Sequence, residues 1–204
     1  MKVLAINGSP RRDGNTAILL RRVLTALQRE GIDGELIQIG GLPLRGCRAC
    51  YGCRSRKDGH CTVRDDPMND ILDQMFAADG LLLGSPTYFT DVTTEMKALI
   101  DRAGFTARAN GDLLRRKVGA AVVSVRRAGA MHAFDTINHF FLINQVVVPG
   151  SSYWNIGIGN RPGEVEDDPE GLATMDVLGA NMAWLMKRLC GPNPSAPIDN
   201  ITPV

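Results

Sequence analysis

The sequence predicts an α/β fold in which a five-stranded parallel sheet is doubly wound, with helices on both of its faces. Two observations support this prediction. Short apolar runs alternate with longer segments whose apolar residues recur every three or four positions. A glycine-containing turn and a helical segment follow the first apolar run directly. Strands that alternate with helices form a parallel sheet covered on both sides, and ligands then bind at the carboxyl ends of the strands.

Five apolar runs are predicted to be the strands of this sheet. The first ends at Asn7, directly before a Gly-Ser-Pro turn, and the fourth has AAVVSV at its centre and is the clearest of the five. The predicted strands span residues 2–7, 34–39, 80–84, 118–125 and 146–148.

Five helices are predicted between and after these strands. The first has apolar side chains at i, i+3, i+4 and i+7, from Leu20 to Leu27, and Asn15 is its expected N-cap. The second begins at Asp66-Pro67, a capping residue followed by a first-turn proline, and its buried stripe runs to Met75. The other helices are predicted at residues 94–107, 133–145 and 171–189.

Length and charge narrow the class of protein. The 204 residues suit one domain, which we expect at 1–190 with a cysteine-rich loop at 40–65, before an irregular proline-rich tail at 191–204. The formal net charge is +1, from 23 basic and 22 acidic residues. The overall charge of the protein is therefore too small to attract nucleic acid or an anionic membrane. The N-terminus has no secretory h-region, and no apolar run approaches the length of a membrane span. We therefore expect a cytoplasmic protein with no nucleic acid or membrane partner.

The loop after the first strand is predicted to bind a phosphate. It runs from Gly8 into the helix that begins near Asn15, and a helix N-terminus after such a turn attracts anions. Ser9, Asn15 and Thr16 add side-chain donors, and Arg11 adds a charge-assisted one. The Walker A lysine and the GxGxxG dinucleotide pattern are both absent, so a phosphate monoester fits best. The plainer alternative is a surface turn before a capped helix.

Three segments together resemble a known family. NGSPRRDGNT after the first strand, GSPTYFTD at 84–91 and SSYWNIGIG at 151–159 are similar to the NADPH-dependent FMN reductase and iron–sulfur flavoprotein branch of the flavodoxin-like superfamily. The resemblance runs in order from Met1 to about Leu189. It implies the flavodoxin-like strand order 2-1-3-4-5, FMN as bound cofactor and NAD(P)H as reductant. It also implies a homodimer or homotetramer with the flavin near a subunit interface, where Tyr153 and Trp154 are plausible contacts.

The resemblance also assigns flavin contacts to two further loops. It implies that Pro86, Thr87, Tyr88 and Phe89 line the isoalloxazine ring, with Tyr88 packing on it and backbone N–H groups at the pyrimidine edge. The alternative is a proline-terminated strand with Tyr88 as a half-buried anchor.

In the loop after the fourth strand, Ser124 and Gly129 are the expected cofactor contacts. The arginines between them could meet the flavin, the nicotinamide phosphates or only water. We predict no catalytic residue, because hydride transfer to a flavin is the chemistry of the cofactors themselves.

Four of the five cysteines, Cys47, Cys50, Cys53 and Cys61, lie within fifteen residues. Three interpretations stay open for them. Their spacing suits the ligands of a [4Fe–4S] cluster, which iron–sulfur flavoproteins carry at this place, although the last spacer is longer here. They could instead be free or redox-active thiols. A structural zinc is the third interpretation, with His60 able to replace one thiolate.

Three functions follow. The leading hypothesis is an FMN-dependent NAD(P)H oxidoreductase that passes electrons to a small acceptor such as a flavin, a quinone or a metal ion. The alternative is an iron–sulfur flavoprotein that carries electrons and exchanges them with a ferredoxin-like partner. A module that senses redox state through its cysteines is the third hypothesis.

Overall fold

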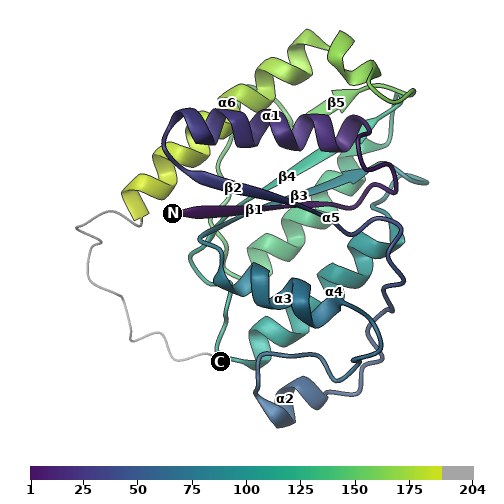
Figure 1. Cartoon of the computed structure of the whole chain (residues 1–204), viewed down its shortest axis with the longest axis vertical. Coiled ribbons are helices and arrows are strands. Elements are labelled where there is room, and N and C mark those ends of the chain that lie inside the picture. Colours follow the sequence, from purple (N-terminus) through teal and green to yellow (C-terminus); the bar gives the residue numbers. More distant parts are fainter. Residues whose placement is uncertain (190–204) are drawn as a thin grey trace.

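The computed structural model describes residues 1–189, which form a five-stranded parallel sheet with helices on both faces (Figure 1). The strands lie in the order β2-β1-β3-β4-β5, and every neighbouring pair is parallel. The strands are β1 (Lys2–Asn7), β2 (Asp33–Gln38), β3 (Gly80–Pro86), β4 (Val118–Val125) and β5 (Ile156–Ile158). The predicted fold class and strand order are confirmed. The predicted tail at 191–204 lies outside the described residues.

Two layers of helices bury their apolar faces against the sheet. The helices are α1 (Asn15–Arg29), α2 (Gly52–Arg56), α3 (Met68–Ala77), α4 (Thr94–Ala109), α5 (Ala130–Ile143) and α6 (Pro169–Leu189), with a 3-10 turn, η1, at Glu164–Asp167. α1 and α6 cover one face, and α3, α4 and α5 cover the other (Figure 1). Because both faces of β3 and β4 are buried, these strands have continuous apolar sequences.

The fifth strand is not where the sequence predicted it. Val147 forms an isolated parallel bridge with Val118 at the start of β4 but no extended ladder. Pro149 follows, and proline has no N–H to donate to a ladder. The chain then runs along β4, and β5 pairs with the carboxyl end of that strand. The predicted strand at 146–148 is therefore wrong, and the third segment of the family resemblance contains the true one.

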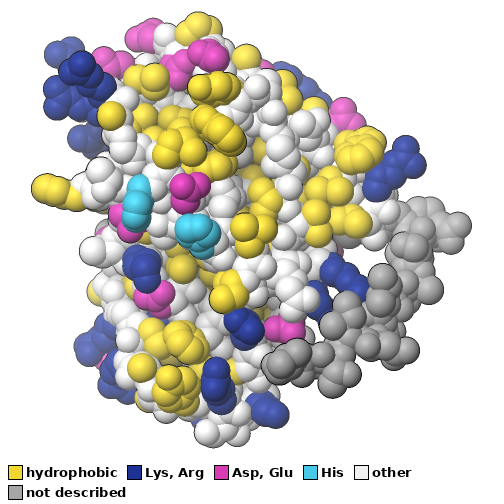
Figure 2. All heavy atoms as spheres, turned by 180° about the vertical axis from the view of Figure 1, so that it is seen from behind, with side chains coloured by type: hydrophobic (Ala, Val, Ile, Leu, Met, Phe, Trp, Pro, Cys, Tyr) yellow, Lys and Arg dark blue, Asp and Glu magenta, His cyan; other side chains and the backbone are white. Residues whose placement is uncertain are grey.

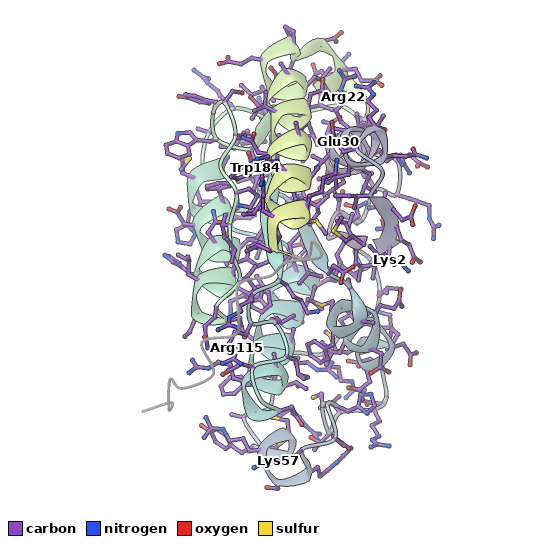
Figure 3. All side chains as sticks on the ribbon, turned by 90° about the vertical axis from the view of Figure 1, so that its left-hand side faces the viewer. Lys2, Arg22, Glu30, Lys57, Arg115 and Trp184 are labelled. Carbon is purple, nitrogen blue, oxygen red and sulfur yellow. The ribbon has the colours of Figure 1, made fainter. Side chains whose placement is uncertain are left out.

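Pairs of charged residues join α1 to α6 on the outer face of the first helical layer. Arg22 donates two hydrogen bonds to Asp176, at 2.7 and 2.5 Å, and Lys187 donates to Glu30 at 2.7 Å. Figure 3 shows Arg22 and Glu30 on the side of the molecule where α1 and α6 run next to each other. In residues 1–189, no helix is long and apolar enough to span a bilayer.

Candidate functional site

The N-terminus of α1 lies buried at the carboxyl end of β1. Its first residues, Asn15, Thr16 and Ala17, are between 0% and 8% exposed, and no side chain caps the turn. Gly14 occupies the N-cap position, so the predicted capping role of Asn15 is wrong. The reason is that Asn15 is itself the first helical residue, and its Oδ1 accepts the N–H of Val165 at 3.4 Å. A buried helix N-terminus that no side chain caps offers its N–H groups to an anion.

Ser9 and Arg11 lie on the loop that leads into this turn. Ser9 is buried, its N–H donates to Asn7 Oδ1 at 3.0 Å, and its Oγ accepts the N–H of Arg11 at 3.2 Å. The exposed guanidinium of Arg11 donates to the carbonyl of Asn160 at 3.2 Å. The structure therefore brings Ser9 to the buried turn and holds Arg11 at its rim, toward the loop after β5.

Thr16 connects this turn to the end of β4. Its hydroxyl shares a buried 2.8 Å hydrogen bond with the hydroxyl of Ser124. The carbonyl of Ser124 in turn accepts the N–H of Thr87 at 2.9 Å, in the loop after β3. The first turn of α1, the carboxyl end of β4 and the loop after β3 thus meet at one place, at the carboxyl edge of the sheet.

Glycines allow backbones to approach closely around this site. A Cβ on Gly40, just after β2, would lie 2.2 Å from the carbonyl carbon and oxygen of Ser9. The N–H of Gly8 donates to the carbonyl of Gly84 at 2.8 Å, and the carbonyl of Gly8 accepts the hydroxyl of Thr93 at 2.9 Å. The loop after β1 is therefore in contact with Gly40 after β2 on one side, and with Gly84 of β3 and Thr93 on the other.

The loop after β3 presents two aromatic side chains to solvent. Beyond Pro86, which ends β3, a tight turn is closed by hydrogen bonds between Tyr88 and Asp91 at 2.8 and 3.0 Å. The two central residues of that turn have φ values of +47° and +68°, and the first of them, Phe89, is fully exposed. Because the N–H groups of Thr87 and Tyr88 bond within the protein, this loop offers mainly its aromatic side chains to a ligand.

The loop after β4 packs on the same turn. Gly129 has φ +87°, and a Cβ there would lie 3.0 Å from Thr90 Cγ2. The missing side chain at Gly129 thus lets the loop after β4 pack closely against the loop after β3. Arg126 and Arg127, in the same loop, are exposed. The predicted flavin contacts therefore lie at the carboxyl ends of β3 and β4, on the loops that follow β1, β3 and β4, and in the first turn of α1.

The four clustered cysteines lie away from this site. Cys47, Cys50, Cys53 and Cys61 line one small cavity beneath α2, against the second half of α4. Figure 3 shows Lys57, the residue after α2, at the end of the molecule far from α6. None of the four thiols is in a disulfide.

The four thiols differ in their surroundings. Cys50 is exposed, and a hydrogen bond with the hydroxyl of Thr62 at 3.0 Å, aided by the N–H of Gly52, lowers its pKa. Burial raises the pKa of Cys53, whose Sγ lies 3.9 Å from the carbonyl of Phe105. Cys50 is therefore the more easily ionised of the two.

Arg102, on α4, donates hydrogen bonds to several residues of the cysteine loop. Its side chain is fully buried, and Nε donates to the sulfur of Cys61 at 3.3 Å. The guanidinium also donates to the carboxylate of Asp66 at 2.5 Å and to the carbonyls of Arg45 and Val63 at 3.1 and 2.9 Å. Sequence reasoning missed this residue. A signal was present, because Arg102 lies three residues after Leu99, on the buried stripe of α4.

The two groups of residues suit different ligands. The buried, uncapped turn with the hydroxyls of Thr16 and Ser124 fits a phosphate. The thiols fit a cluster by number and by their shared cavity. Within residues 1–189, however, no three His, Cys, Asp or Glu side chains converge as metal ligands, so cluster binding requires the thiols to turn toward one another.

Comparison with known proteins identifies the family. The profile of the NADPH-dependent FMN reductase family matches residues 1–161. The chain belongs to this family. It is accordingly an oxidoreductase of a flavin-dependent, NAD(P)H-linked group, as the sequence predicted.

Within the FMN reductase family, the chain is similar to several iron–sulfur flavoproteins. One from Methanocaldococcus jannaschii is 39% identical over 194 residues, which cover 92% of this chain and 98% of that protein. Another, from Methanosarcina thermophila, is 32% identical over 177 residues, covering 86% and 90%. Among solved structures, RosB has a TM-score of 0.71 at 20% identity, covering 94% of this chain and 81% of that one, which supports the shared fold.

Proposed function

We propose that this protein is an iron–sulfur flavoprotein, which binds FMN at the loops after β1, β3 and β4 and a [4Fe–4S] cluster at Cys47, Cys50, Cys53 and Cys61. In this role it carries electrons between a reduced nicotinamide and an acceptor. The observation that carries the proposal is the combination of two sites in one chain, an uncapped buried helix N-terminus and four thiols around one cavity.

The flavin site is supported by what each loop offers. The first turn of α1 and the hydroxyls of Thr16 and Ser124 would hold the phosphate, with Ser9 beside them and Arg11 at the rim. The exposed rings of Tyr88 and Phe89 would cover the flavin ring. Bound FMN would supply the chemistry, because a flavin accepts a hydride from nicotinamide and can release electrons one at a time.

The cluster is supported by the relatives and by the cysteine loop. The relatives named above are iron–sulfur flavoproteins that match over most of their length. In this chain Arg102 donates a hydrogen bond to the sulfur of Cys61 from a fully buried position. Hydrogen bonds to ligating sulfurs are a usual means of tuning cluster potentials, and a buried cation beside thiolates offsets their charge.

A second candidate function is a flavin reductase without a cluster, which reduces a small acceptor directly. The thiols do not converge as they stand, which is what free thiols would show. The lowered pKa of Cys50 would then mark it as the reactive thiol of the loop.

One experiment separates the two functions. The purified protein is reconstituted anaerobically with iron and sulfide, and visible spectra, iron content and EPR of the reduced protein are recorded. We expect about four irons per chain and bound FMN. The change Cys61→Ser should remove most of the iron and leave FMN in place, whereas Cys190→Ser, outside the loop, should leave both. A protein that binds FMN but gives no cluster signal after reconstitution would be the flavin reductase.

A further inference from the structure

Two amide side chains lie opposite each other where β1 and β2 end. Asn7 is the last residue of β1 and Gln38 the last of β2, and the parallel ladder pairs them directly. Nδ2 of Asn7 donates to Oε1 of Gln38 at 2.7 Å. Asn7 is 1% exposed, and Gln38 is half-buried. The pair therefore lies at the carboxyl edge of the sheet, where the loop leading to the uncapped turn of α1 begins.

Both amides bind the backbone of the loops that follow their strands. Oδ1 of Asn7 accepts the N–H of Ser9 at 3.0 Å. Nε2 of Gln38 donates to the carbonyl of Ser9 at 2.5 Å and to that of Gly40 at 2.9 Å. Because an amide nitrogen has two hydrogens to donate, both donors of Gln38 are used within the protein. We call these four hydrogen bonds the amide clasp.

The backbones of the two loops also touch each other. The carbonyl of Asn7 accepts the N–H of Ile39 at 2.9 Å and that of Gly40 at 3.1 Å. A Cβ on Gly40 would lie 2.2 Å from the backbone of Ser9 and 2.6 Å from the carbonyl oxygen of Gly8. The loops after β1 and β2 therefore leave no room for a ligand between them.

Contacts with the loop after β5 flank the other side of the turn. The guanidinium of Arg11 donates to the carbonyl of Asn160 at 3.2 Å, and Oδ1 of Asn15 accepts the N–H of Val165 at 3.4 Å. The uncapped first turn of α1 thus lies between the amide clasp and the loop after β5.

The amide clasp contains no charged side chain. Lys, Arg, Asp and Glu are spread over the surface of the molecule, as Figure 2 shows for one face. The carbonyl oxygens of Ser9 and Gly40 carry partial negative charge, which opposes a phosphate nearby. The neutral amide of Gln38 engages both oxygens without placing a fixed charge beside the anion site.

A dinucleotide needs room beside the phosphate that binds at the turn. In dinucleotide-binding folds the loop after the first strand holds a pyrophosphate, and an acidic residue about 20 positions farther on binds a ribose of the nucleoside. In this chain the residue that ends β2 is Gln38, and both of its donors bind carbonyls of the protein. The end of β2 therefore offers a nucleoside neither a carboxylate nor a free amide donor.

We propose that Asn7 and Gln38 are positioning residues that restrict the flavin site to a phosphate monoester, so that the protein binds FMN and rejects FAD. The amide clasp closes the place beside β1 that the second phosphate and the nucleoside of FAD would need. It also orients Ser9, whose Oγ accepts the N–H of Arg11, so that the hydroxyl hydrogen is left to donate to the phosphate. This role rests on the proposed flavin site.

Fluorescence titrations of the full chain with FMN, FAD and riboflavin test the role. We expect the wild type to bind FMN far more tightly than FAD. Gln38→Leu is similar in size but has no donor, and it should reduce this preference about tenfold, the equivalent of one buried hydrogen bond. Riboflavin has no phosphate, so its affinity should change little. Gln74→Leu is the matched control, because Gln74 is an exposed residue of α3 whose amide also donates to a backbone carbonyl, at 3.1 Å, and it should leave the preference unchanged.

A second variant tests whether the two amides act together. Asn7→Ala should reduce the preference as Gln38→Leu does, and the double variant should lose no more than either single one. Thermal midpoints check the fold, and Gln38→Asn, one methylene shorter, replaces Gln38→Leu if that variant does not fold.

Four results would overturn the proposal. They are a wild type that binds FAD as tightly as FMN, an unchanged preference in Gln38→Leu, an equal loss of all three flavins, and effects of the two amides that simply add. A wild type that binds no flavin would instead overturn the proposed function, and this role with it.

Discussion

Arg102 and Cys61 are 41 positions apart in the sequence, and Nε of the arginine donates to the sulfur of the cysteine at 3.3 Å. The same guanidinium holds the carboxylate of Asp66 and two backbone carbonyls of the cysteine loop. The buried side chain of Arg102 thus connects α4 to the loop that contains the four thiols. Any group that these thiols bind depends on how Arg102 positions the loop.

The first prediction concerns this positioning role. Arg102→Lys keeps the charge but cannot reach four acceptors, so the Cys61 sulfur should lose its donor. We expect iron affinity after anaerobic reconstitution to fall about 10- to 100-fold, and the potential of any retained cluster to fall. Iron titration and an EPR-monitored redox titration measure both. Arg108→Lys, on the exposed face of the same helix, is the control, and an equal loss there would contradict the role of Arg102.

The second prediction concerns the phosphate of FMN. Thr16→Val removes the hydroxyl that bonds Ser124 at the buried helix N-terminus and should weaken FMN binding by about 1–3 kcal/mol. Riboflavin lacks the phosphate, so its affinity should change far less. Fluorescence titrations with both flavins give the comparison. Thr25→Val, on the exposed side of the same helix, should leave both affinities as they are.

The third prediction concerns the close approach of Gly40, just after β2, to the loop after β1. Gly40→Ala places a Cβ 2.2 Å from the backbone of Ser9, so that loop must shift. We expect FMN affinity to fall and the thermal midpoint to drop. Gly46→Ala, where a Cβ meets nothing within 4 Å, is the matched control. Unchanged FMN binding in Gly40→Ala would show that the loop tolerates the shift and that its position does not matter to the flavin.

The fourth prediction concerns acid stability. Burial alone would raise the pKa of Asp66, but hydrogen bonds from Arg102 and from the N–H of Arg45 outweigh it and hold the pKa below its usual value. Such a group stabilises the fold above its unfolded pKa of about 3.9, and this contribution is lost as pH falls through the folded pKa. Asp66→Asn leaves Arg102 buried and unpaired and should cost about 3–5 kcal/mol at pH 7.

Urea unfolding from pH 7 down to pH 2 provides the measurement. The difference between wild type and Asp66→Asn should narrow as pH falls below about 4, because the unfolded wild-type chain then takes up a proton at Asp66 before the folded protein does. It should be smallest once pH lies below the lowered pKa of the folded carboxyl group. Asp65→Asn, an exposed neighbour, should follow the wild type over the whole range. A wild-type advantage that persists unchanged at the lowest pH would exclude the pairing with Arg102 as its source.

The sequence by itself predicted the alternation of strands and helices, the glycine-containing turn before the first helix and the cysteine loop. These features are local. Apolar periodicity, a glycine turn before Asn15 and the spacing from Cys47 to Cys61 act over a few residues and are visible without knowledge of what packs against them. The family resemblance then supplied the strand order, which the structure confirms.

Tertiary structure decided what depends on distant partners. The fifth strand lies at 156–158, because pairing with the carboxyl end of β4 outweighs the stronger apolar run at 146–148. The bond between Thr16 and Ser124 spans 108 positions, and the one between Arg102 and Cys61 spans 41. Local propensity carries no information about such long-range contacts, because the residues meet only when the helices dock on the sheet.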